Sequence, residues 1–102
     1  MTAARPHSRL DATSRVVAAS DQVSTELEGE AVILHLGDGV YYGLNPVGAR
    51  LWSLLEEPRA VSELRDALVA DYEVDAETAE RDVLELLGEL MDRGLLEPAT
   101  DD

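Results

Sequence analysis

Two histidines and a pair of adjacent tyrosines are the side chains of this chain that could carry chemistry. His35 lies in an apolar stretch, whereas His7 lies in a polar N-terminal stretch. A lone imidazole has no second histidine to complete a zinc site and no neighbouring nucleophile to activate. The chain has no cysteine, which excludes disulfides, thiolate metal sites and a cysteine nucleophile. We therefore interpret His35 as an ordinary strand residue.

The acidic residues are numerous but are not arranged for catalysis. There are 22 of them against 8 basic residues, and the net charge is -14. Most fall on polar faces of predicted helices, where Glu89 and Arg93, for example, are spaced to form an ion pair along the helix. Neither a glycine-rich phosphate loop nor a metal-binding motif occurs. These patterns predict a protein that is not an enzyme and has no cofactor or metal, and the charge disfavours nucleic acid as a partner.

The length and composition predict one small globular domain. The chain has 102 residues, of which 45% are hydrophobic, and it lacks an apolar run long enough to cross a membrane. The N-terminal stretch is polar and does not resemble a signal peptide, so we expect a cytoplasmic protein. We expect residues 1–14 to be a flexible tail, residues 15–97 to form the domain, and residues 98–102 to be an acidic tail.

Strand patterns come first along the chain and helix patterns follow. Residues 15–27 are moderately strand-like, and a break near Asp21 fits their pattern. Residues 31–36 and 40–44 are clearer strands. Three helices are predicted over residues 46–56, 62–71 and 76–93, with Asn45, Ser62 and Asp75 as N-caps and Gly94 after the last. We expect Trp52 to lie in the core, together with the apolar stripe of the last helix, which comprises Ala79, Val83, Leu86, Leu87 and Leu90. The order predicts an α+β fold, a winged helix-turn-helix with a three-stranded antiparallel sheet followed by three helices.

The hairpin between the second and third strands has two candidate registers. A loop of Asp38-Gly39 places Leu34 and Leu36 on one face with Tyr41 and Gly43. A loop of Gly37-Asp38-Gly39 instead unites two apolar sets on one face: Val32, Leu34 and Leu36 with Val40, Tyr42 and Leu44. Because a slip of one residue would destroy such a face, we expect this second register, with Gly39 in the left-handed conformation. Ile33, His35, Tyr41 and Gly43 then lie on the opposite face.

The third predicted strand has the features of a peptide-binding edge. Alternation sends Tyr41 and Tyr42 to opposite faces, and the chosen register leaves Tyr41 outside the core. The strand contains neither proline nor charge, so it lacks the usual protection against pairing with another chain. An extended peptide could add to it by β-augmentation. The candidate peptide-binding residues of this strand are Val40, Tyr41, Tyr42, Gly43 and Leu44.

The stretch Gly39-Val40-Tyr41-Tyr42-Gly43-Leu44-Asn45-Pro46-Val47-Gly48-Ala49 resembles the PqqD-like domains called RiPP recognition elements. These domains bind the leader peptides of ribosomally made, post-translationally modified peptides. The resemblance covers about residues 16–97 and includes Val61-Ser62-Glu63-Leu64 and Leu90-Met91-Asp92-Arg93-Gly94-Leu95-Leu96. Within the family, the paired tyrosines followed by Leu-Asn-Pro-x-Gly are most similar to the stand-alone members of lasso-peptide pathways.

The resemblance implies a fold, a partner and a binding mode. A leader peptide would add as a fourth strand beside residues 40–44, in a groove walled by the helix over residues 76–93. The facing wall would be supplied by Ala76, Ala79, Glu80, Val83, Leu84 and Leu87. In lasso pathways the leader carries a Tyr-x-x-Pro motif, a separate protease removes the leader, and a cyclase threads the remaining peptide.

Two other functions are compatible with such a fold. A winged helix-turn-helix commonly binds DNA, but the last predicted helix is acidic, with Arg81 and Arg93 as its only cations. The second is a peptide chaperone for a radical enzyme in quinone-cofactor or thioether-peptide synthesis. The sequence of the neighbouring precursor peptide would separate that function from the lasso case.

Overall fold

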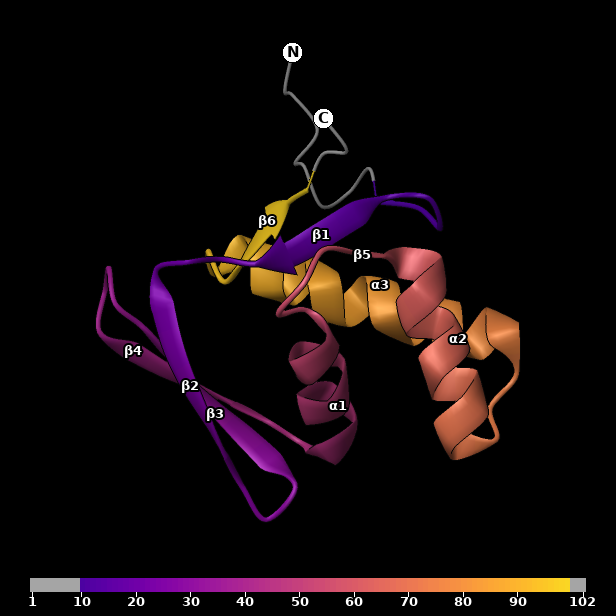
Figure 1. Ribbon diagram of the computed structural model, residues 1–102, viewed down its shortest axis with the longest axis horizontal. Coiled ribbons are helices and arrows are strands. Elements are labelled where there is room, and N and C mark those ends of the chain that lie inside the picture. The colour runs from indigo at the N-terminus through magenta and orange to yellow at the C-terminus, as the bar shows by residue number, and fades with distance from the viewer. Residues whose placement is uncertain (1–9, 100–102) are drawn as a thin grey trace.

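The computed structural model describes residues 10–99 and has the predicted α+β fold. Its elements in chain order are β1 (Arg15–Ala18), β2 (Gln22–Leu27), β3 (Glu30–His35), β4 (Val40–Leu44), α1 (Pro46–Leu54), β5 (Arg59–Ala60), α2 (Val61–Tyr72), α3 (Ala76–Asp92) and β6 (Leu96–Pro98). Figure 1 shows α1 standing between the β2-β3-β4 sheet on one side and α2 on the other.

The strands form two antiparallel sheets. The predicted 3-stranded sheet is present in the order β2-β3-β4, and a second small sheet has the order β5-β1-β6. The predicted first strand over residues 15–27 is therefore two strands that belong to different sheets. The chain turns between them at Ala19, which is buried and donates its N–H to the Leu95 carbonyl. The break near Asp21 is confirmed, but the sequence did not predict the second sheet, which depends on pairing with distant residues.

The predicted register of the β3–β4 hairpin is wrong. His35 pairs with Val40, Leu34 with Tyr41 and Ile33 with Tyr42, so Leu36 also belongs to the loop. Ile33 is fully buried and shares the core face with Tyr42 and Leu44, whereas Val32 and Leu34 lie on the outer face. The outer face is itself apolar because Val23 and Tyr41 flank Leu34. Alternation therefore could not identify the buried face.

The helix boundaries follow local hydrogen bonding. Asn45 Oδ1 accepts from Gly48 N at 2.8 Å, and Asp75 Oδ1 accepts from Thr78 N at 2.7 Å. The latter bond, which stabilises the carboxylate, lowers the pKa of Asp75. The prediction of Ser62 as a cap is wrong, because α2 begins at Val61 and the Glu63 carboxylate accepts from Ala60 N instead. Gly94 ends α3 with a φ of 76°, as its position predicted.

One apolar core joins the helices to both sheets. It is built from Val16 of β1, Ile33 of β3, residues of all three helices, and Leu95 and Leu96 after α3. Trp52 is buried in it, as predicted, and its indole N–H donates to Ser24 Oγ at 3.1 Å. This bond satisfies the one polar group of the ring and fastens α1 to the edge strand β2.

The described ends of the chain are joined to the domain. Ala12 and Ser14, expected in the N-terminal tail, accept hydrogen bonds through their carbonyls from Ser62 N and Val61 N. At the other end Pro98 belongs to β6, and Ala99 N donates to the Arg15 carbonyl. Residues 1–9 and 100–102 of the two predicted tails lie outside the described residues. Within residues 10–99, no helix has the length and apolar character needed to cross a membrane.

Candidate functional site

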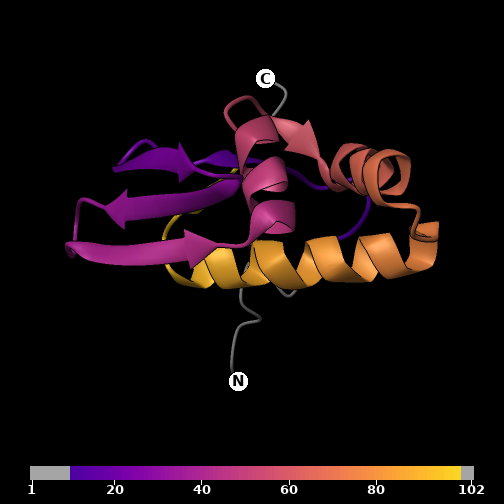
Figure 2. The same ribbon diagram turned by 90° about the horizontal axis from the view of Figure 1, so that it is seen from below.

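β4 is an edge strand of the main sheet. It pairs with β3 on one side, and no strand of residues 10–99 pairs with it on the other. In Figure 2 the end of β4 meets the last turns of α3, and the two elements run in opposite directions. The backbone N–H and C=O groups on an open edge of this kind are a template for another extended chain.

Local side chains define where β4 begins and ends. Before it, Asp38 Oδ1 accepts from Val40 N at 3.0 Å and lies 3.0 Å from His35 Nδ1. The hydrogen bond from Val40 N lowers the pKa of Asp38. Gly39 has a φ of 71°, the left-handed conformation that the sequence predicted. After β4, the Asn45 cap starts α1, so the exposed edge is limited to the five residues Val40–Leu44.

The two tyrosines of β4 have different environments. Tyr41 is 67% exposed on the outer face, whereas Tyr42 packs partly buried against the core. The Arg93 guanidinium lies over the Tyr42 ring, 5.0 Å from its centroid, a cation–π arrangement. The prediction that Tyr42 faces inward and Tyr41 outward is confirmed, although the register behind it was wrong.

A groove accompanies the open edge of β4. One hollow is lined by Tyr41, Tyr42, Gly43 and Leu44 of β4 and by Leu86, Glu89, Leu90 and Arg93 on the side of α3. A second is lined by Gly43, Leu44, Asn45, Val47, Gly48, Leu51, Leu68, Asp82, Leu86 and Glu89. The hollows share Gly43, Leu44, Leu86 and Glu89, so they form one feature, which we call the β4–α3 groove. Val40 lies beyond its lining, at the exposed start of the strand.

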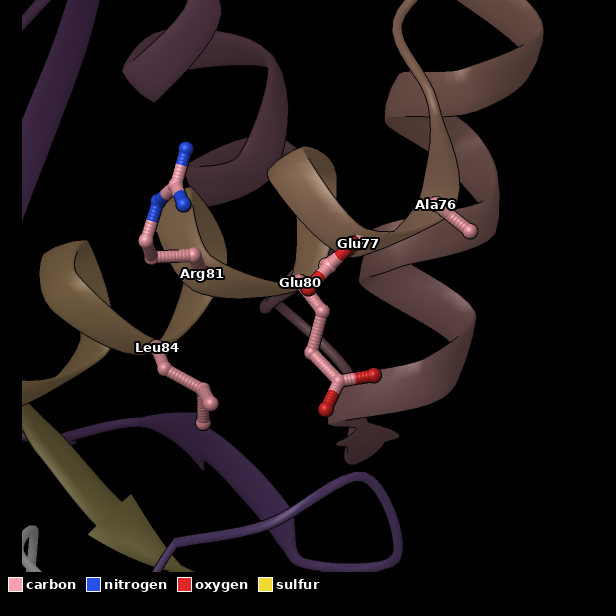
Figure 3. A pocket seen from close by; sticks show the side chains of 5 residues that line it. All are labelled: Ala76, Glu77, Glu80, Arg81 and Leu84. Atoms are coloured by element: carbon pink, nitrogen blue, oxygen red, sulfur yellow. The ribbon is translucent and has the colours of Figure 1, made fainter.

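None of the α3 residues predicted for the wall lines this groove. Ala79, Val83 and Leu87 are completely buried in the core. The other three line a hollow elsewhere on α3, which comprises Ala76, Glu77, Glu80, Arg81 and Leu84 and is shown in Figure 3. Glu80 also forms an ion pair there with Arg65 of α2 at 2.9 Å, and that hydrogen bond raises the pKa of Arg65.

The α3 residues that line the groove were missed because they flank the core stripe. Asp82, Leu86, Glu89 and Arg93 recur at intervals of four, three and four residues, which places them on one side of the helix. The sequence assigned Leu86 to the core and Glu89 with Arg93 to a surface ion pair. Among the described residues no ion pair joins Glu89 to Arg93, whose guanidinium lies over Tyr42 instead. The signal in the sequence that could have identified these groove residues was the mixture of leucines and charged residues on the flank of the buried stripe.

The described residues show no arrangement typical of a catalytic or metal site. Within residues 10–99 no group of three or more His, Asp or Glu side chains could hold a metal ion. The only hydrogen-bonding partner of the His35 side chain in this part of the chain is Asp38, in the hairpin turn. The clearest feature that could act on another molecule is therefore the open edge with its groove.

Comparison with known proteins gives a family match and structural neighbours. The family model described as coenzyme PQQ synthesis protein D (PqqD) matches residues 30–96. TbiB1, solved in complex with the TbiA(beta) leader peptide, is 44% identical, with a TM-score of 0.77 over 83% of this chain and 99% of that chain. No match was found among curated proteins.

Two more distant structures share the fold. A lasso peptide synthetase B1 complexed with the leader peptide is 24% identical, with a TM-score of 0.73 over 81% of this chain and 98% of that one. The PqqD truncation of Methylobacterium extorquens PqqCD, a stand-alone RiPP recognition element, is 18% identical, with a TM-score of 0.75. That match covers 91% of this chain and 99% of the other.

Proposed function

Since this chain belongs to the PqqD family, we propose that it is a non-catalytic adaptor for the leader of a lasso-type precursor peptide. The leader adds as a strand to β4 and occupies the β4–α3 groove. The adaptor then presents the precursor to a separate leader protease and a lasso cyclase. The observation that carries this proposal is the open edge of β4 beside a groove, in a chain 44% identical to a protein solved with a leader peptide.

The physical properties of the edge support strand addition. Main-chain hydrogen bonds along β4 would supply affinity, and alternate leader side chains would enter the groove and supply specificity. Tyr42 and Leu44 face the groove between the strand and α3. Tyr41 and Gly43 would flank the leader on the outer face of the sheet. A Cβ added to Gly43 would meet no atom within 4 Å, so the outer face of the sheet is open at this position.

Charge disfavours a DNA-binding function for this fold. The net charge is -14, and α3, the helix that would enter DNA, exposes Asp82, Glu85 and Glu89. Phosphate contacts depend on Lys and Arg that release condensed counterions. The observed distribution would repel the DNA backbone.

The family model's description favours a second candidate, a peptide adaptor in quinone-cofactor synthesis. The identities favour a leader peptide of the TbiA(beta) kind, because the chain is 44% identical to TbiB1 but 18% identical to the PqqD structure. A direct comparison of affinity for the leader of a lasso precursor and for the precursor of a quinone cofactor separates the two.

Amide hydrogen exchange with the TbiA(β) leader peptide and the leader of the neighbouring precursor tests the binding mode. We expect binding with a dissociation constant of roughly 1 μM or below and slower exchange of amides along β4. The opposite edge strand, β2, is an internal control because strand addition at β4 leaves its exchange unchanged. Absence of binding by both leaders would contradict the proposed function. Binding with protection at β2 alone, or at neither edge, would contradict addition to β4.

A further inference from the structure

The wall that α3 contributes to the β4–α3 groove carries charges of opposite sign at its two ends. Asp82 lines the hollow beside Leu44 and Asn45, whereas Arg93 lines the hollow beside Tyr41 and Tyr42. Glu89 lines both hollows. An occupant lying along β4 would therefore meet carboxylates near the Leu44 end of the strand and a guanidinium near the Tyr42 end.

These charges are available to an occupant. Among residues 10–99, no ion pair joins Asp82 or Glu89 to a cation. Arg93 lies over the Tyr42 ring, and this stacking uses the face of the guanidinium and leaves its N–H donors for a carboxylate. The ring also fixes the guanidinium beside the strand edge, which reduces the conformational entropy that an incoming carboxylate must overcome.

An apolar section separates the charged ends. Leu86 and Leu90 of α3 line it, opposite Tyr42 and Leu44 of β4. Apolar side chains of the occupant would bury their surface against these leucines, which favours binding. The α3 side of the groove thus begins with Asp82 and ends with Arg93, and Glu89 lies between its two leucines.

The spacing of these side chains matches an extended peptide. Glu89 and Arg93 are one helical turn apart, or about 6 Å along α3, and side chains on one face of a strand are about 7 Å apart. Asp82 and Arg93 are separated by about 16 Å along the helix, somewhat more than the roughly 13 Å between strand residues i and i+4. Because alternate residues of an added strand face α3, complementary charges must be an even number of residues apart.

We propose that the β4–α3 groove selects a leader segment by its charge order: a basic side chain beside Leu44, an apolar one in the middle, and an acidic one beside Tyr42. The basic and acidic residues stand two or four positions apart and face α3, and the apolar side chain is the α3-facing residue between them when they stand four apart. This inference rests on the proposed function, since it names which leaders the groove accepts.

A charge scan of the TbiA(β) leader peptide tests the inference. Each position is replaced in turn by Lys and by Glu, and the dissociation constants are measured by calorimetry in about 0.15 M salt, where the Debye length of about 8 Å suppresses the effect of net charge. We expect one position to prefer Lys and another, two or four residues away, to prefer Glu. Each preference should be about threefold to fivefold, the size expected for an exposed ion pair.

Charge reversal on α3 assigns each preference to its residue. Glu89→Arg should invert the preference at the Lys-selecting position alone, and Arg93→Glu the preference at the Glu-selecting position alone. Glu85→Arg and Arg81→Glu make the same changes of net charge on exposed α3 residues outside the groove, and they should invert neither. Thermal melts of the variants check that the fold is retained.

The outcomes distinguish the two proposals. A leader that binds and is protected at β4, but whose charge scan is flat or is unaffected by Glu89→Arg and Arg93→Glu, overturns the charge order and leaves the adaptor function standing. Equal inversion by the control variants would show that net charge acts in place of the groove, and would also overturn it. Absence of binding by both the TbiA(β) leader and the leader of the neighbouring precursor overturns both proposals.

Discussion

Tyr41 and Tyr42 are consecutive residues whose expected roles differ because a strand sends them to opposite faces. Tyr42 is partly buried against the core and lies under Arg93. Tyr41 stands on the outer face, where little of the protein covers it. A substitution at such an exposed residue can weaken binding while it changes the free energy of unfolding little.

At the residue scale, we predict that Tyr41→Thr weakens leader binding several-fold and changes the free energy of unfolding by less than about 0.5 kcal/mol. Threonine retains a preference for strands but loses the ring that would lie beside the added leader strand. Calorimetry with the TbiA(β) leader and urea unfolding measure the two effects.

Leu27→Thr is the matched control for this substitution. Leu27 has a similar exposure, 62%, and lies on β2 at the opposite edge of the same sheet. It should alter neither quantity appreciably. A loss of stability from Tyr41→Thr without a loss of binding would show that Tyr41 is a packing residue.

At the element scale, the register of β3 against β4 decides which residues form the core. Ile33 is fully buried, whereas Leu34, its neighbour, pairs with Tyr41 on the outer face. The two faces of this sheet carry similarly apolar side chains, so the faces differ in how deeply these side chains are buried and not in residue type.

We predict that Ile33→Ala lowers the free energy of unfolding by about 2–5 kcal/mol, the cost of a cavity in a packed core. Leu34→Ala should cost clearly less, because the side chain it removes is partly exposed. Urea denaturation of both variants, followed by circular dichroism, gives the comparison. If Leu34→Ala proved the more damaging, the register expected from the sequence would be restored.

α3 shows how far periodicity can identify a site on a helix. Ala79, Val83, Leu87 and Leu90 were identified as core residues from their spacing, and all are buried. The same spacing could not tell which flank of that stripe faces β4. The sequence placed the wall on the flank of Ala76, Glu80 and Leu84, whereas the flank beside β4 carries Leu86 and Glu89, because tertiary packing sets the orientation of α3 relative to the sheet.

At the scale of the whole molecule, net charge should influence stability. A net charge of -14 repels itself in the compact state. Added salt shortens the Debye length from about 30 Å at 0.01 M to about 8 Å at 0.15 M and screens this repulsion.

We therefore predict that the melting temperature of the protein rises when sodium chloride is increased over this range at neutral pH. Thermal melts followed by circular dichroism measure it, and potassium chloride at equal ionic strength should produce the same rise. An unchanged or lower melting temperature would mean that ion pairs such as Arg50–Asp71 and Arg65–Glu80 outweigh the general repulsion.

The sequence alone determined the features that depend on neighbours along the chain. The caps at Asn45 and Asp75, the turn at Gly39, the end of α3 at Gly94 and the bounds of β4 were all predicted, because each arises from hydrogen bonds or dihedral angles within a few residues. The resemblance carried by residues 39–49 likewise indicated the family that the comparisons show.

The tertiary structure alone decided the features that depend on contacts between distant segments. These are the β5-β1-β6 sheet, the buried face of β3, and the side of α3 that lines the groove. In each case the local pattern is compatible with more than one arrangement. The choice is made by what packs against the element, and so Leu86, Glu89 and Arg93 became recognisable as groove residues only when α3 was placed beside β4.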